Sequence, residues 1–82
     1  MQTEADRIAT AIQRIRDGAM LRPAGQRAGY VRENIRHHED RAQRFAMSRK
    51  TPTGWSFALH SELLLGLADL EAEFRDAGRV AA

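Results

Sequence analysis

Apolar residues recur along most of the chain at intervals of three and four, the spacing of one face of an α-helix. No stretch alternates apolar and polar residues with the two-residue period of a strand, and runs of β-branched residues are few. The pattern divides into three segments, which predict helices over about residues 4–21, 26–49 and 56–77. We therefore expect an all-α fold in which residues 1–82 form a single helical domain.

Capping and breaking residues mark the ends of these segments. Thr3 is a suitable N-cap for the first segment, and Asp6, three residues later, completes a variant of the capping box. Pro23 should end that helix, because proline disfavours helical geometry in the residue before it. Gly78 stands where the residue after a helix C-terminus belongs. Short connections predict antiparallel neighbours, arranged as a small three-helix bundle or a helical hairpin.

The first two segments carry narrow apolar seams, whereas the third carries a broad one. The seam of the first segment consists of Ala5, Ile8, Ile12, Ile15 and Ala19. The seam of the second consists of Ala28, Val31, Ile35, His38, Ala42 and Phe45. The main stripe of the third consists of Leu59, Leu63, Leu67, Leu70 and Phe74. We expect these three sets of side chains to form the core.

The third segment has more apolar surface than its main stripe. Trp55 extends the stripe on one side, and Phe57, Leu64 and Ala68 lie on the other, so the apolar arc exceeds half of the circumference. A helix in a bundle needs an arc of only a little over ~100°. The remaining face carries an acidic ridge with Leu65 beside it. The acidic ridge consists of Glu62, Asp69, Glu73 and Asp76.

Two arrangements account for this surplus. The third helix is either central, covered by both other helices, or partly covered by another chain. Tryptophan is strongly enriched at interface hot spots, so Trp55 either closes the end of the bundle or anchors a partner. The expected partner-binding residues are Trp55, Phe57, Leu64, Leu65 and Ala68. We expect another protein as the partner, and a homodimer that forms through the third helix.

Charge is unevenly distributed and supports a second interpretation. Residues 22–50 carry eight basic and three acidic groups, whereas residues 51–82 carry two basic and five acidic groups. The candidate contacts to nucleic acid or to an acidic surface are Arg32, Arg36, Arg41, Arg44, Arg49 and Lys50. These residues scatter around the helix, and Asp40 lies four residues from both Arg36 and Arg44, which indicates a solvated, internally compensated face. Nucleic-acid binding is therefore the second choice.

Few features of the sequence indicate catalysis or metal binding. The chain has no cysteine, which excludes disulfides, thiolate nucleophiles and cysteine zinc sites. His37 and His38 are adjacent, so on a helix they point about 100° apart and cannot converge on one ion. No nucleophile motif or phosphate-binding glycine loop occurs, and we expect no enzyme activity, metal or cofactor. His38 lies on the apolar seam, so burial should lower its pKa.

The first residues, MQTEAD, are polar and acidic, unlike a signal peptide, and the longest apolar run, residues 63–68, is far too short to span a membrane. We expect a cytoplasmic protein. The favoured hypothesis is a non-catalytic interaction module that binds and regulates or inhibits a larger protein. A small inhibitor, adaptor or antitoxin-like regulator from a phage or mobile element fits that description. The alternative is a small DNA- or RNA-binding regulator, and a weaker third is a structural assembly subunit.

Overall fold

The computed structural model describes residues 3–48 and 57–81, and it places side chains within residues 3–44 and 58–78. The described chain contains three α-helices, α1 (Glu4–Met20), α2 (Arg27–Ser48) and α3 (Phe57–Ala81). A short 3-10 helix, η1 (Ala24–Gln26), precedes α2. No strand occurs within the described ranges, so the prediction of an all-α fold is confirmed.

Helix α1 begins at the predicted cap. The hydroxyl of Thr3 accepts a hydrogen bond from the backbone N–H of Asp6, and the Asp6 carboxylate accepts one from the backbone N–H of Thr3, both at 3.1 Å. These two bonds form the predicted capping box and satisfy two N–H groups that the helix leaves without backbone partners. Helix α3 continues through Gly78 to Ala81, so this glycine does not end the helix.

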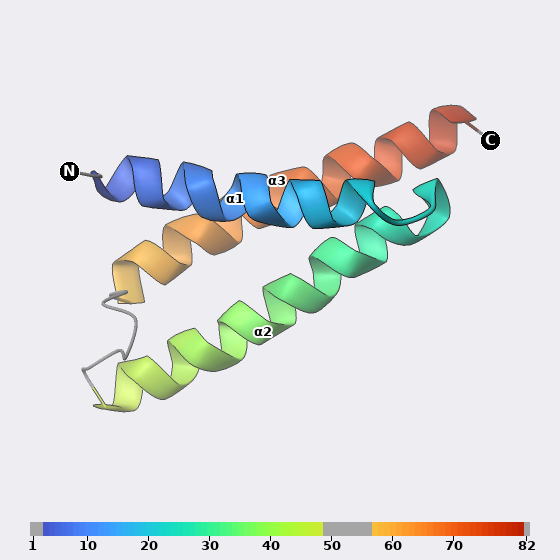
Figure 1. Cartoon of the computed structure of the whole chain (residues 1–82). Helices are drawn as coiled ribbons and strands as arrows, with labels where there is room; N and C mark the ends of the chain where they lie inside the picture. Colours follow the sequence, from blue (N-terminus) through green and yellow to red (C-terminus); the bar gives the residue numbers. More distant parts are fainter. Residues whose placement is uncertain (1–2, 49–56, 82) are drawn as a thin grey trace.

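The three helices pack as an elongated molecule that measures 44 × 28 × 18 Å. Helix α2 runs alongside α3 and makes the most extensive contact in the molecule, whereas α1 crosses α3 and contacts α2 mainly near the corner that joins them (Figure 1). Helix α3 therefore lies against both other helices. Within the described ranges, no helix combines the length and the apolar character needed to cross a membrane.

The core comes from the seams that the apolar spacing predicts. Ala28 and His38 of the α2 seam are only half-buried, and the side chain of Phe45 lies outside the described part of the structure. The buried apolar side chains are Ile15, Ala19, Val31, Ile35, Ala42, Leu59, Leu63, Leu67, Leu70 and Phe74. The whole main stripe of α3 is buried, which confirms the predicted inner face of that helix. In the seam of α1, Ile8 and Ile12 are half-buried and Ala5 is exposed, so the N-terminal half of α1 contributes less to the core.

Two glycines allow helices to approach closely. A Cβ atom at Gly66 of α3 would lie 2.5 Å from Cδ1 of Ile12, so the isoleucine side chain of α1 rests directly on the α3 backbone. At the corner between α1 and α2, a Cβ atom at Gly18 would overlap the ring of Tyr30. The guanidinium of Arg22 lies over this ring, 4.4 Å from the ring centroid. These close contacts hold α1 against its neighbouring helices because the surfaces that meet are complementary in shape.

Candidate protein-interaction site

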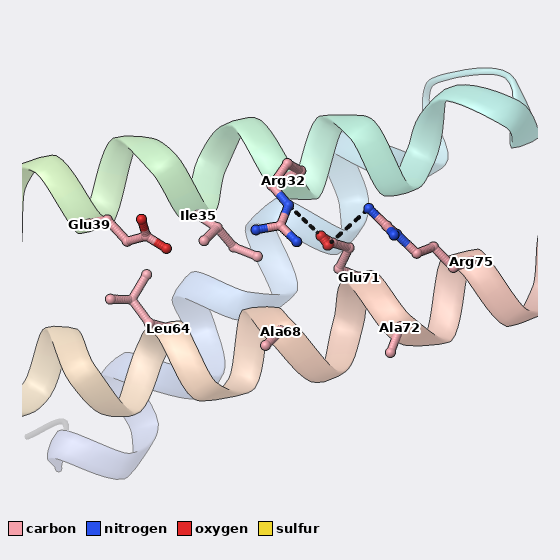
Figure 2. A pocket seen from close by; sticks show the side chains of 8 residues that line it. All are labelled: Arg32, Ile35, Glu39, Leu64, Ala68, Glu71, Ala72 and Arg75. Atoms are coloured by element: carbon pink, nitrogen blue, oxygen red, sulfur yellow. Dashed lines mark ion pairs between the residues drawn. The ribbon is translucent and has the colours of Figure 1, made fainter.

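A groove of about 330 Å³ runs between α2 and α3, and Figure 2 shows the side chains around it. Its lining consists of Arg32, Ile35 and Glu39 from α2 and Leu64, Ala68, Glu71, Ala72 and Arg75 from α3. The α3 residues face the groove because each lies three or four residues from another member of the set, on one side of the helix. The name α2–α3 groove refers to this set. Half of its lining residues are apolar and half are charged, so it offers both contact area and directional contacts.

A buried carboxylate sits at one end of the α2–α3 groove. Only 4% of Glu71 is exposed, yet two arginines compensate its charge. Nε of Arg32 lies 2.7 Å from one carboxylate oxygen of Glu71, and Nη2 of Arg75 lies 3.5 Å from the other (Figure 2). The shorter contact is an ion pair rather than an aligned hydrogen bond, since that oxygen has no hydrogen bond within the described structure. The ion pair between Arg32 and Glu71 therefore connects α2 to α3.

The side of α3 that faces away from the core is mostly apolar. Leu65 is 71% exposed there, and Ala58, Ala68 and Ala72 are also exposed. We call this face the outward strip, and it consists of Ala58, Ser61, Leu65, Ala68 and Ala72. Ala68 and Ala72 belong to the outward strip and to the α2–α3 groove, so the two features are continuous. The acidic ridge borders the strip on the other side, and all four of its residues are exposed.

The structure brings together only part of the predicted partner-binding set. Leu64 is half-buried and lines the α2–α3 groove together with the exposed Ala68, while Leu65 lies next to them on the outward strip. Phe57 is the first residue of α3, but its side chain lies outside the described part of the structure. Trp55 also lies outside the described residues. The interaction site is therefore built on the middle of α3.

The predicted basic residues have different surroundings. Arg32 pairs with Glu71 across the helix interface, and Nε of Arg44 lies 3.2 Å from a carboxylate oxygen of Asp40, as the four-residue spacing predicts. Arg36 is exposed on α2, whereas Arg41 is half-buried near the histidines. Arg49 and Lys50 lie outside the described residues. Two of the four described arginines therefore already neutralise a carboxylate of the same chain.

Two histidines meet where α2 and α3 approach each other. The ring centroids of His38 and His60 are 5.8 Å apart, and His37 packs edge-on against His38 at 5.5 Å. Burial lowers the pKa of His38 from 6.5 to about 4, with further contributions from the nearby His37, His60 and Arg41. Burial and Arg41 also lower the pKa of His60, which is only 2% exposed. The predicted direction for His38 is confirmed, and the lowered pKa values of His38 and His60 favour the neutral forms of these two rings.

Sequence reasoning did not single out the burial of Glu71 and His60. On a helical wheel at ~100° per residue, both lie within about 80° of Leu63, inside the apolar arc of α3. A polar residue inside an apolar arc is expected to be buried and to pair with a polar group of the facing helix. The position of these two residues in the arc is therefore the signal that the sequence contains. The partner of Glu71 is Arg32. Which residue of α2 becomes the partner depends on how α2 is placed against α3.

Within the residues that the structure describes, no three His, Asp or Glu side chains are arranged to hold a metal ion. Comparison of the chain with models of protein families, with curated proteins and with solved structures finds no match. The α2–α3 groove and the outward strip are therefore the features of the described structure that indicate a function.

Proposed function

We propose that this chain is a non-catalytic interaction module, an antiparallel three-helix bundle that binds a larger protein and regulates or inhibits it. The observation that carries the proposal is the outward strip of α3, where Leu65 is 71% exposed. The strip continues into the α2–α3 groove through Ala68 and Ala72. A contiguous exposed apolar surface of this kind, bordered by charged residues, marks interaction sites on soluble proteins.

The physical reason is the cost of leaving such a face in water. Burial of apolar surface stabilises a complex by roughly 25 cal/mol per Å². A partner that covers the leucine and the alanines of the outward strip therefore binds more favourably for each of these side chains that it buries. The charged end of the α2–α3 groove, with Glu71 held between Arg32 and Arg75, supplies a fixed polar edge. A hydrophobic centre with a polar rim is the ordinary composition of a protein interface.

Two other functional hypotheses involve the outward strip itself or the arginines of α2. Dimerisation would place a second copy of α3 on the outward strip. Nucleic-acid binding would use the arginines of α2 instead, but Arg32 and Arg44 are paired with Glu71 and Asp40, which reduces the positive charge available to phosphates. The protein-interaction reading is favoured because its apolar surface is exposed.

Affinity purification from the native host, with and without nuclease, tests the proposal when three forms of the protein are compared. The wild type should recover one dominant protein whose recovery resists nuclease. Leu65→Glu should lose that protein, because it places a charge at the centre of the outward strip. Leu21→Glu is the matched control, since Leu21 is 88% exposed at the corner between α1 and α2, away from the strip.

Two results would contradict the proposal. If Leu65→Glu and the wild type recovered the same partner equally well, the outward strip would not be the binding site. If recovery involved many proteins and disappeared after nuclease treatment, the arginines of α2 would be the functional residues, and the protein would be a nucleic-acid-binding regulator.

A further inference from the structure

The outward strip has the spacing of a helix-packing seam. Its residues, Ala58, Ser61, Leu65, Ala68 and Ala72, follow one another at intervals of three and four, which places them in one line along α3. Leu65 lies about 200° around the helix from Leu63, so the strip is on the side opposite the core. The line covers about four turns, or about 21 Å, which is long enough to support a second helix. Its four apolar residues, Ala58, Leu65, Ala68 and Ala72, are exposed.

The sizes of the side chains in the strip favour a helix with large apolar residues. Four of the five strip residues are alanine or serine, so the axis of a docked helix can approach closely there. The α2–α3 groove opens beside Ala68 and Ala72, and its volume of about 330 Å³ gives room for bulky side chains of the docked helix. Leu65 in turn projects from the strip as a knob that a hole in the docked helix would receive.

Charge along the border of the strip selects the kind of helix. Glu62, Asp69 and Asp76, three members of the acidic ridge, are exposed and follow one another every seven residues along one edge. The opposite edge carries Leu64, Glu71 and Arg75, and Glu71 is already paired with Arg32 and Arg75. Neither edge therefore offers a row of positive charges, and Glu62 and Asp69 make the edge beside the middle of the strip acidic.

This distribution disfavours a second copy of α3 as the occupant. In an antiparallel pair, the acidic ridges of the two copies would face each other along the seam, and like charges at such positions are destabilising. In a parallel pair, Glu62 and Asp69 would lie level with Leu64 and Glu71 of the other copy, and of these acidic positions only Asp76 would lie level with an arginine, Arg75. A helix with lysine or arginine on one flank would instead complement Glu62 and Asp69 of the ridge.

We infer that the outward strip of α3 binds an amphipathic helix of a different protein, with large apolar residues facing the strip and Lys or Arg residues along the flank that faces the acidic ridge. This inference rests on the proposed function and specifies the chemistry of its partner. It commits to the helix-in-groove mode of recognition, in which apolar residues supply affinity and flanking charges supply specificity.

A pair of synthetic peptides tests the inference directly. Each has about 18 residues, which spans about 27 Å as a helix, and carries leucine at seam positions. One carries lysine along one flank, and the other carries glutamate at the same positions. Isothermal titration calorimetry with the full chain should show that the lysine peptide binds at least about tenfold more tightly, because only it complements the ridge.

Charge reversal on the protein separates specific docking from general attraction. The variant Glu62→Lys with Asp69→Lys should reverse the preference, so that the glutamate peptide becomes the tighter ligand. The variant Asp17→Lys with Glu33→Lys makes the same change in net charge at exposed positions of α1 and α2 and should leave the lysine peptide preferred. Equal effects of the two double variants, or no preference between the peptides, would overturn the inference.

Two further measurements distinguish this inference from the proposed function. Leu65→Glu should abolish peptide binding while the circular dichroism spectrum stays that of the wild type, and Leu65→Ala should weaken binding less. Sedimentation of the wild type at micromolar concentration should show a monomer, and a dimer that Leu65→Glu dissociates would make a second copy the occupant. If Leu65→Glu lost the captured host protein but ridge reversal had no effect on that capture, the function would stand and the basic helix would be refuted.

Discussion

Toward α1, helix α3 presents Gly66 to the side chain of Ile12, and the nearby ion pair between Arg16 and Glu73 is largely exposed to solvent. Toward α2, the same helix presents two buried ionisable side chains, His60 and Glu71. The α1–α3 contact therefore depends on the shapes of apolar groups, whereas the α2–α3 contact depends on charge and protonation. A change of pH should act mainly on the second contact, whereas salt should act mainly on the more exposed ion pair of the first. Four predictions test this difference, from the largest expected effect to the smallest.

The largest difference between the two contacts should come from removing one arginine from each of them. Arg32→Ala leaves the buried carboxylate of Glu71 with Arg75 alone, at 3.5 Å, and should lower the free energy of unfolding by about 2–3 kcal/mol. Arg16→Ala removes an exposed pair and should cost less than about 1 kcal/mol. Urea denaturation at pH 7 measures both values, and equal losses would show that the two contacts do not differ in this way.

The next effect is pH dependence that originates in the α2–α3 contact. His38 faces His37 and Arg41 from α2 and His60 from α3, and its pKa in the folded protein is lowered from 6.5 to about 4. Since the unfolded chain takes up the proton first, the contribution of His38 is fully present above about pH 6.5 and is lost as the pH falls toward 4. The loss should be about 1–3 kcal/mol, reduced by the partial exposure of the ring.

Substitution identifies the residue responsible for this pH dependence. His38→Leu should flatten the free energy of unfolding between pH 7 and about pH 5. His37→Gln, at the exposed neighbouring position, should retain most of the slope. A His38→Leu variant with the pH profile of the wild type would assign the slope to His60 instead, whose pKa is lowered as well.

A smaller effect tests shape at the α1–α3 contact. Gly66→Ala improves helix propensity by about 1 kcal/mol but brings the new Cβ to 2.5 Å from Cδ1 of Ile12, so the two effects should nearly cancel. Ile12→Val removes Cδ1, and in that background Gly66→Ala should stabilise the protein by about 1 kcal/mol. A double-mutant cycle measures the coupling between the two positions. Additive effects would mean that the isoleucine tip moves aside without cost.

The smallest effect should occur outside both contacts. Leu65→Ala removes an exposed side chain of the outward strip and should change the free energy of unfolding by less than about 0.5 kcal/mol. Leu63→Ala, two residues earlier on the buried face, should cost about 2–5 kcal/mol because it leaves a cavity in the core. Thermal denaturation of both variants compares the two faces. A large loss from Leu65→Ala would mean that the strip is covered in the free protein.

The sequence contained the information for each helix but not for their mutual placement. The stripe from Leu59 to Phe74 and the capping box at Thr3 are local patterns, in which the side chains that act together are three or four residues apart. The pair between Asp40 and Arg44 is predictable for the same reason. The spacing of apolar residues therefore anticipates which face of each helix is buried.

The candidate site depends on contacts between residues that are far apart in the sequence. Arg32 reaches Glu71 only because α2 lies beside α3 in one axial position, and a shift by one helical turn would give Glu71 another neighbour. The α2–α3 groove has the same origin. The sequence identified Leu64, Leu65 and Ala68 as surplus apolar surface, but the separation of these residues into a groove wall and an exposed strip follows from where α2 lies.

The close packing of Tyr30 on Gly18 has a consequence for the order in which the molecule folds. The two residues are near in sequence, so their contact closes a short loop, and the entropy lost in closing it is small. We expect the α1–α2 corner to form early and α3 to dock onto it later. Gly18→Ala should then slow refolding in stopped-flow experiments, whereas substitutions at Gly66 should act mainly on the unfolding rate. The corner would thus serve as the nucleus of a fast-folding helical chain.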